Sequence, residues 1–155
     1  MPLARPDPTP IEIERQLKAL DAATLFPGAR SPLGAMAGLF VYFGAMNDAH
    51  TIAQELHTRE GSFWNGIIHR QEPDAFNAGY WFGQVGKHPV FPGIAEVARL
   101  NRFPSGPHWD PRAFIDYCES ARLRHGSIEE SIAMRIQLAD WQLLFDYCAS
   151  PEKIS

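Results

Sequence analysis

The chain has few cysteines, no long hydrophobic run and no surplus of basic residues, and each shortage excludes a class of protein. Two cysteines in 155 residues do not make a disulfide framework, so we expect Cys118 and Cys148 to be buried free thiols rather than a disulfide. The longest apolar run, Leu33 to Met46, is too short to cross about 30 Å of hydrocarbon and predicts a buried core helix. A net charge of −4 with scattered Lys and Arg argues against binding to nucleic acid or to an anionic membrane.

Low-complexity sequence is also lacking, and 45% of the residues are hydrophobic, which is ordinary for a globular protein. The length suits one domain whose core needs neither disulfides nor a structural metal. We expect a flexible N-terminal arm over residues 1–8, where three prolines leave little apolar material, and a single helical domain over residues 9–155. The first residues lack the hydrophobic stretch of a signal peptide, which favours a cytoplasmic protein.

Helix starts are marked by capping patterns. Thr9-Pro10-Ile11-Glu12 combines an N-cap hydroxyl, a proline and a capping-box glutamate, which predicts a helix from about Pro10 to Ala23. Asp110-Pro111 repeats the cap and proline ahead of a helix over Arg112 to Arg122. Ser127 to Glu130 forms a second capping box before apolar residues at helical spacing, which predicts the last helix. These signals predict an all-α fold.

Residues 90–109 predict a connecting segment. Prolines at 92, 104 and 107 leave room for one short helix, which we expect over Ile94 to Arg102. We expect this segment to pack on the layer formed by the other helices.

Residues 33–89 contain two segments that align with each other at an offset of 29 residues. Small residues at matching positions let antiparallel helices approach closely, and a Gly or Pro between them breaks the chain at a turn. Each segment therefore predicts a helical hairpin, so that residues 33–89 form a doubled helical hairpin. The aligned positions are Ala37, Phe40, Gly44, Ala49, Ala53 and Leu56 in the first segment and Gly66, His69, Pro73, Ala78, Phe82 and Val85 in the second.

The doubled segment carries two resemblances. Its spacing is similar to the tetratricopeptide pattern, and residues 77–82 (Asn-Ala-Gly-Tyr-Trp-Phe) resemble the second helix of a Sel1-type repeat. The His-Thr-x-Glu-Gly motif that begins at His57 and the His-Arg-x-Glu-Pro-Asp motif that begins at His69 resemble a family of hypothetical proteins from bacteria and fungi. Together the resemblances imply tetratricopeptide-like helical hairpins packed into one compact domain, and they assign no activity.

Two His-x-x-Glu pairs in the doubled hairpin predict a possible metal site. His57 with Glu60, and His69 with Glu72, each place an imidazole and a carboxylate three residues apart, a spacing that shares one helical face. In the alternative, Glu60 caps one helix N-terminus, Glu72 or Asp74 caps the next, and the histidines bond to backbone or carboxylate groups. A chain without a cofactor is the first expectation, and one divalent transition metal is the alternative.

A binding or scaffolding module is the leading functional prediction. Rigid aromatic residues beside an arginine are favoured anchors, and helical-repeat hairpins commonly bind through such surfaces. The sequence has no nucleophile elbow, no activated thiol and no phosphate-binding loop. We expect a protein, peptide or small-molecule partner, with a homo-oligomer as a further possibility; a metal-dependent enzyme or sensor is the alternative. The predicted ligand-binding residues are His57, Trp64, His69, Arg70, Asn77, Tyr80 and His88.

Overall fold

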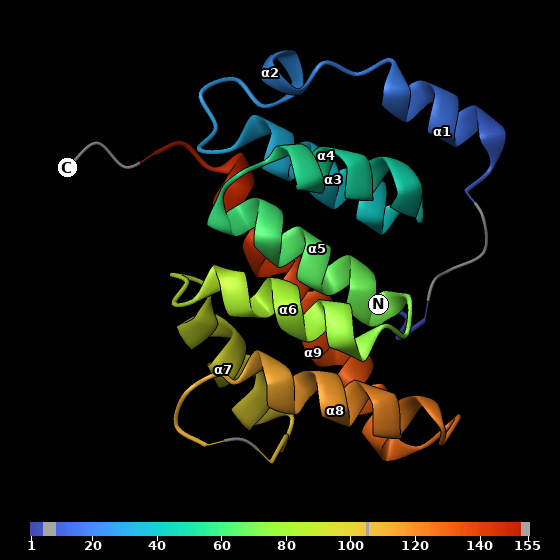
Figure 1. Ribbon diagram of the computed structural model, residues 1–155, viewed down its shortest axis with the longest axis vertical. Helices are drawn as coiled ribbons and strands as arrows, with labels where there is room; N and C mark the ends of the chain where they lie inside the picture. Colours follow the sequence, from blue (N-terminus) through green and yellow to red (C-terminus); the bar gives the residue numbers. More distant parts are fainter. Residues whose placement is uncertain (5–8, 105, 153–155) are drawn as a thin grey trace.

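The computed structural model describes residues 1–4, 9–104 and 106–152, and every regular element within these ranges is a helix (Figure 1). The predicted all-α fold is therefore confirmed for this part of the chain. The helices are α1 (Ile11–Lys18), α2 (Ala22–Leu25), α3 (Pro32–Tyr42), α4 (Met46–Glu55), α5 (Arg59–Gln71), α6 (Ala75–Val85), α7 (Phe91–Leu100), α8 (Pro111–Arg122) and α9 (Ile128–Ala149).

Two helix pairs occupy the segments that align at an offset of 29 residues. α3 packs on α4, α5 packs on α6, and α4 packs on α5, so the pairs lie side by side. Gly44 in the first turn and Pro73 in the second both have positive φ, 80° and 30°, at positions that the offset matches. A Cβ at Gly66 would lie 2.7 Å from the ring of Phe82, so the close approach of α5 and α6 requires glycine there.

The longest helix, α9, passes behind α5 and α6 in Figure 1 and contacts α3, α5, α7 and α8. The side chain of Ser127 accepts a hydrogen bond from the backbone N–H of Glu130 at 3.1 Å, which confirms the predicted cap. Near its other end, Trp141 donates its indole N–H to the carbonyl of Gly38 at 2.9 Å. This bond fixes α9 against α3.

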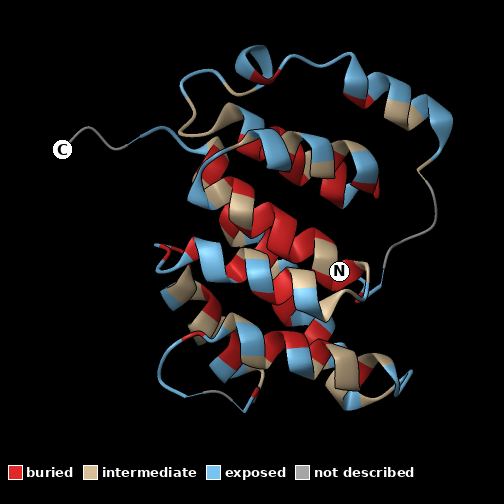
Figure 2. Ribbon diagram, viewed as in Figure 1, coloured by how far each residue is buried: buried red, intermediate tan, exposed pale blue. Residues whose placement is uncertain are grey.

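Buried residues gather on α3, α5 and α9 (Figure 2). α3 lies within the apolar run of the sequence and is buried along most of its length, as predicted. Cys118 and Cys148 are buried free thiols, which also confirms the sequence prediction. Among the described residues, no helix is both long and apolar enough to cross a bilayer.

The helix expected over Pro10 to Ala23 is two helices instead of one. α2 begins separately because the carboxylate of Asp21 accepts a hydrogen bond from the backbone N–H of Thr24 at 2.8 Å. Thr9 does not cap α1; its hydroxyl donates to the carbonyl of Phe43 at 2.6 Å. The N-cap hydroxyl that the pattern predicts is thus used for a contact with the turn between α3 and α4.

The first four residues pack on the helices. Leu3 is 3% exposed and belongs to the hydrophobic core. The carbonyl of Pro2 accepts hydrogen bonds from the side chains of Gln71, at 2.9 Å, and Gln137. The expectation of a flexible arm does not hold for residues 1–4, and residues 5–8 lie outside the described residues.

Candidate functional site

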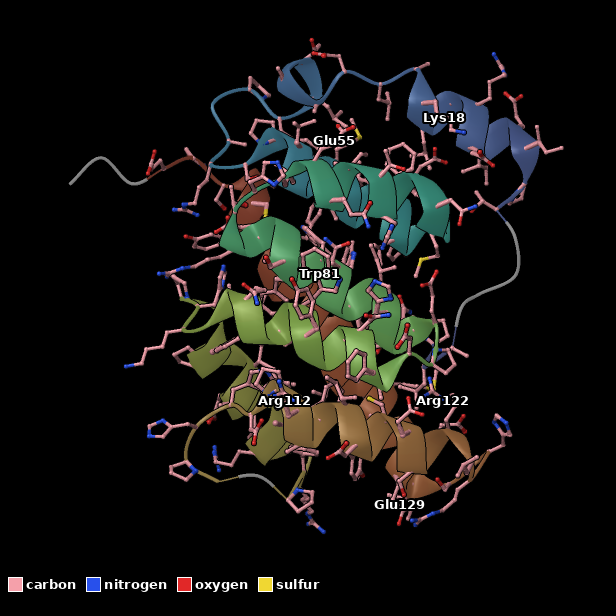
Figure 3. The ribbon with its side chains drawn as sticks, viewed as in Figure 1. Lys18, Glu55, Trp81, Arg112, Arg122 and Glu129 are labelled. Atoms are coloured by element: carbon pink, nitrogen blue, oxygen red, sulfur yellow. The ribbon has the colours of Figure 1, made fainter. Side chains whose placement is uncertain are left out.

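The seven predicted ligand-binding residues do not form one surface. Three are buried: Trp64, Arg70 and His88. Four are half-buried or exposed: His57, His69, Asn77 and Tyr80. Trp64 lies beneath α3, where its ring would be within 2.8 Å of a Cβ at Gly38, so it packs the core and presents nothing to a ligand. Trp81, which Figure 3 labels, is a half-buried aromatic residue of α6.

Arg70 belongs to a buried ion pair and not to a binding surface. Its Nη2 donates to Oδ2 of Asp140 at 2.8 Å, and its Nε donates to Oε1 of Gln137 at 3.0 Å. The guanidinium also lies over the rings of Phe114 and Phe82, 4.8 and 5.5 Å from the centroids. Burial raises the pKa of Asp140, and the charge of Arg70 opposes this shift. Arg70 therefore joins α5 to α9.

The four predicted metal ligands are not brought together. Glu60 lies at the start of α5 and contacts His88, whereas His69 and Glu72 lie at its end. Glu60 and His69 are nine positions apart, which is roughly 13.5 Å along the helix. His57 is exposed before α5 begins. Within residues 1–4, 9–104 and 106–152, no group of three or more His, Cys, Asp or Glu side chains is arranged to hold a metal ion. The quartet is therefore not one site.

Glu60 and His88 are in contact, and aromatic rings surround the imidazole of His88. His88 accepts a hydrogen bond at Nδ1 from the backbone N–H of Val90 at 3.3 Å, so its proton lies on Nε2, which is 3.4 Å from Oε1 of Glu60. The rings of Phe63 and Tyr147 lie 5.3 and 4.9 Å from the imidazole. The contact with His88 lowers the pKa of Glu60 to about 2, against the opposing effect of burial. This pair anchors α5 to the segment before α7.

A second histidine contact lies at the opposite end of α5. Nε2 of His50, on α4, is 3.2 Å from Nε2 of His69, with the rings 85° apart. Nδ1 of His69 faces the carboxylates of Glu72 at 3.6 Å and Asp74 at 3.8 Å. Burial, followed by the neighbouring His69, lowers the pKa of His50. Asp74 also caps α6 through the backbone N–H of Asn77 at 3.1 Å, as one of the two sequence alternatives proposed.

Between these two contacts, Asn65 is an unusual buried residue. It is fully buried on α5, one helical turn before His69 and therefore on the same face. Neither its amide oxygen nor its amide nitrogen has a hydrogen-bond partner among the described residues. Buried amides are nearly always paired, so this part of the α4–α5 contact is polar but incompletely satisfied.

A large concave feature lies elsewhere, between α7 and the segment that leads to α8. It is a groove of about 1030 Å³, close to the upper end of the size range of small-molecule sites. His88 is the predicted ligand-binding residue that lines it, and the helix starts of α7 and α8 both reach it. The apolar residues that form most of its wall include Phe91, Pro92, Ala95, Phe103, Pro107 and Trp109.

Among the charged residues described around the groove, Lys87 makes no ion pair. Glu96 is paired with Arg99 at 2.7 Å, so these two largely cancel. The carboxylate of Asp110 is engaged as the cap of α8, where it accepts the backbone N–H of Arg112 at 2.9 Å. Lys87 is exposed at the rim. The N-terminus of α7 has no side-chain cap, and its partial positive charge adds to that of Lys87.

Comparisons with protein-family models, with curated proteins and with solved structures found no significant match. The functional argument therefore rests on the geometry of the molecule.

Neither the groove nor the histidine contact was predicted from sequence spacing. Residues 90–109 were expected to be a connecting segment, and Pro92 and Pro107, which line the groove, were the available signal of a rigid wall. His50 was not among the predicted ligands because its partner, His69, lies on a different helix. The packing of α4 on α5 places these two histidines near each other.

Proposed function

We propose that this protein is a helical binding module whose ligand is a small molecule with an apolar body and a negatively charged group. The observation that carries the proposal is the groove of about 1030 Å³ between α7 and the segment before α8. Ligand sites of this size are typically lined by apolar and aromatic side chains with a few polar groups that orient the ligand. The wall formed by Phe91, Ala95 and Trp109 fits that description.

The preference for a negative group follows from the rim. Lys87 makes no ion pair with a described carboxylate of the groove, because Glu96 pairs with Arg99 and Asp110 caps α8. The uncapped start of α7 supports the same sign of ligand charge. The indole N–H of Trp109, buried and without a partner in the described part of the chain, adds a donor beside the groove.

The doubled hairpin provides the scaffold in this proposal. The matched turns at Gly44 and Pro73 support two equivalent units, and we extend this to tetratricopeptide-like packing as part of the proposal. Placement in the cytoplasm is a further part of it, and the two buried free cysteines are compatible with a reducing compartment.

The test uses 1-anilinonaphthalene-8-sulfonate, an aromatic anion, as the probe. We expect saturable binding at one site, followed by fluorescence and by the indole signals of the four tryptophans in proton–nitrogen NMR spectra. The signal of Trp109 moves, whereas that of Trp141, whose N–H is bound to Gly38, stays in place. Ala95→Trp fills the groove and abolishes binding, and Lys87→Glu weakens it several-fold.

The matched controls lie outside the groove. Ala23→Trp adds the same side chain to the exposed face of α2, and Arg135→Glu reverses an exposed charge on α9, so both should bind the probe as the parent protein does. Thermal melts of all variants verify folding. Probe binding that survives Ala95→Trp, or that fails to move the Trp109 signal, overturns the groove as the site.

A further inference from the structure

The contact between His50 and His69 is the starting point for a second site. The two Nε2 atoms lie 3.2 Å apart, on helices of different hairpins, and both imidazoles are only partly covered. The pair lies on the α4–α5 contact, whereas the groove lies on α7 and α8, so the two sites share no residue. The inference below therefore stands independently of the proposed function.

The surroundings indicate which ring nitrogens carry protons. Nδ1 of His69 lies within 4 Å of the carboxylates of Glu72 and Asp74, which favour an N–H at that position and a lone pair on Nε2. On α4, the amide nitrogen of Gln54 lies 3.4 Å from Nε2 of His50 and can donate only to a lone pair. With these tautomers both facing Nε2 atoms present lone pairs, whereas a proton on either Nε2 would join the two rings by a hydrogen bond.

Two nitrogen lone pairs that face each other at this distance repel unless a cation lies between them. Two imidazole nitrogens bound to one tetrahedral zinc ion, each at 2.0–2.1 Å, are about 3.3 Å apart. The spacing of 3.2 Å between the Nε2 atoms of His50 and His69 is close to this separation. We propose that His50 and His69 bind one divalent transition metal ion through their Nε2 atoms.

The donor set indicates the kind of ion and the openness of the site. Imidazole nitrogens favour zinc, copper, nickel and cobalt over magnesium or calcium. Because no third His, Cys, Asp or Glu of the described chain joins them, the remaining positions belong to water or to an added ligand. Asn65, buried beside His69 with an unpartnered amide, supplies a polar group that a metal-bound water can satisfy.

The carboxylates of Glu72 and Asp74 face the outer nitrogen of His69, Nδ1, at 3.6 and 3.8 Å, which is beyond hydrogen-bond distance. Their negative charge favours a proton on Nδ1 and so leaves the lone pair on Nε2 for the metal ion. Neither carboxylate joins the two histidines in a three-residue ligand group. Their removal should weaken metal binding less than removal of either histidine does.

The test measures binding of cobalt(II) and zinc to protein that has first been dialysed against a chelator. We expect one cobalt ion per chain, with the visible absorption of a low-symmetry site, and competition by zinc in calorimetry. His50→Ala and His69→Ala each weaken zinc binding at least tenfold. His57→Ala and His125→Ala, which remove exposed histidines, leave it unchanged.

Folding is verified separately, so that a loss of metal binding can be attributed to the missing histidine and not to unfolding. His50→Gln and His69→Gln keep the polar contact across α4 and α5, and their melting curves should remain close to that of the parent protein. Absence of a one-to-one cobalt complex in the parent protein overturns the proposal. So does binding that persists in both His50→Ala and His69→Ala, because the ion then lies elsewhere.

Discussion

At the scale of single residues, the pair of Glu60 and His88 makes a prediction about pH. The pKa of Glu60 is lowered from 4.5 to about 2, chiefly by His88, so the folded state favours the ionised carboxylate. Its contribution to stability is fully present above the unfolded pKa near 4.5 and is lost as the pH falls towards 2. Because 16% of the Glu60 side chain stays exposed to solvent, which screens the interaction, we expect about 1 kcal/mol at pH 7.

Urea unfolding of Glu60→Gln at pH 7 and pH 3 measures this contribution. The variant should be less stable than the parent protein at pH 7, and the difference should be clearly smaller at pH 3, where the unfolded carboxyl is protonated. Glu55→Gln, at the exposed end of α4, is the matched control and should change neither value. Parallel stability curves for the parent protein and Glu60→Gln across this range would contradict the assigned pair.

The two thiols give a second prediction at this scale. Burial raises the pKa of Cys118 to about 11 and that of Cys148 to about 12, and only the thiolate reacts with disulfide reagents. We expect neither cysteine to react with 5,5′-dithiobis(2-nitrobenzoate) in folded protein at pH 8, and both to react in 6 M guanidinium chloride. Rapid release of one equivalent of thiolate from folded protein would show that one of the helices opens readily.

The residues that sequence reasoning misplaced share one property: their partners are distant in the chain. Arg70 beside aromatic residues looked like a ligand anchor, but its partner, Asp140, lies 70 positions later. His69 was expected to pair with Glu72 and does lie 3.6 Å from it. Its closer contact, at 3.2 Å, is with His50 on the neighbouring helix α4. Local spacing predicts neighbours on one helix and gives no information about which helix packs opposite.

At the scale of helices, local signals predicted most of the fold. The caps Asp110 and Ser127 act as predicted, because a side chain that bonds to the next turn needs no information from elsewhere. The matched positive φ of Gly44 and Pro73 agrees with the 29-residue offset for the same reason. Thr9 failed as a cap because a carbonyl brought close by α3, that of Phe43, takes its hydroxyl.

The contact of α5 with α9 depends on the buried pair of Arg70 and Asp140, and this gives a third prediction. Nη1 of Arg70 and Oδ1 of Asp140 have no partners in the described part of the chain, so the pair is costly to bury. Arg70→Met and Asp140→Leu should each destabilise the protein by about 3–5 kcal/mol, because each leaves one buried charge unpaired.

The double variant, with both substitutions, should regain most of the loss. The two apolar side chains leave no charge in the core, so urea unfolding of the four proteins yields a large favourable coupling energy. Gln71, adjacent to Arg70 but bonded to the backbone of Pro2, provides a control through Gln71→Met, which should not couple to Asp140→Leu. Additive losses for Arg70→Met and Asp140→Leu would show that the pair does not act as a unit.

At the scale of the whole molecule, the first residues of the chain pack against helices from later parts of the sequence. Leu3 enters the core, and its carbonyl accepts a hydrogen bond from Arg122 at 3.0 Å; Figure 3 labels this arginine on α8. The same guanidinium donates to the carbonyl of Arg70 at 3.2 Å, so α5, α8 and the N-terminal segment meet at one point. A proline-rich start predicts no such packing, because the pocket for Leu3 exists only after distant helices assemble.

The last prediction concerns this closure. Leu3→Ala removes a side chain that is 3% exposed, and at the margin of the core we expect a loss of about 2 kcal/mol. For a protein of this size the melting temperature should fall by about 4–8 °C. Leu123→Ala, which truncates the same side chain at a position that is 87% exposed, should leave the melting temperature within about 1 °C of the parent value. Equal melting temperatures for the two variants would mean that residues 1–4 contribute nothing to stability. The hydrogen bonds of Gln71 and Gln137 to Pro2 would then be incidental to the fold.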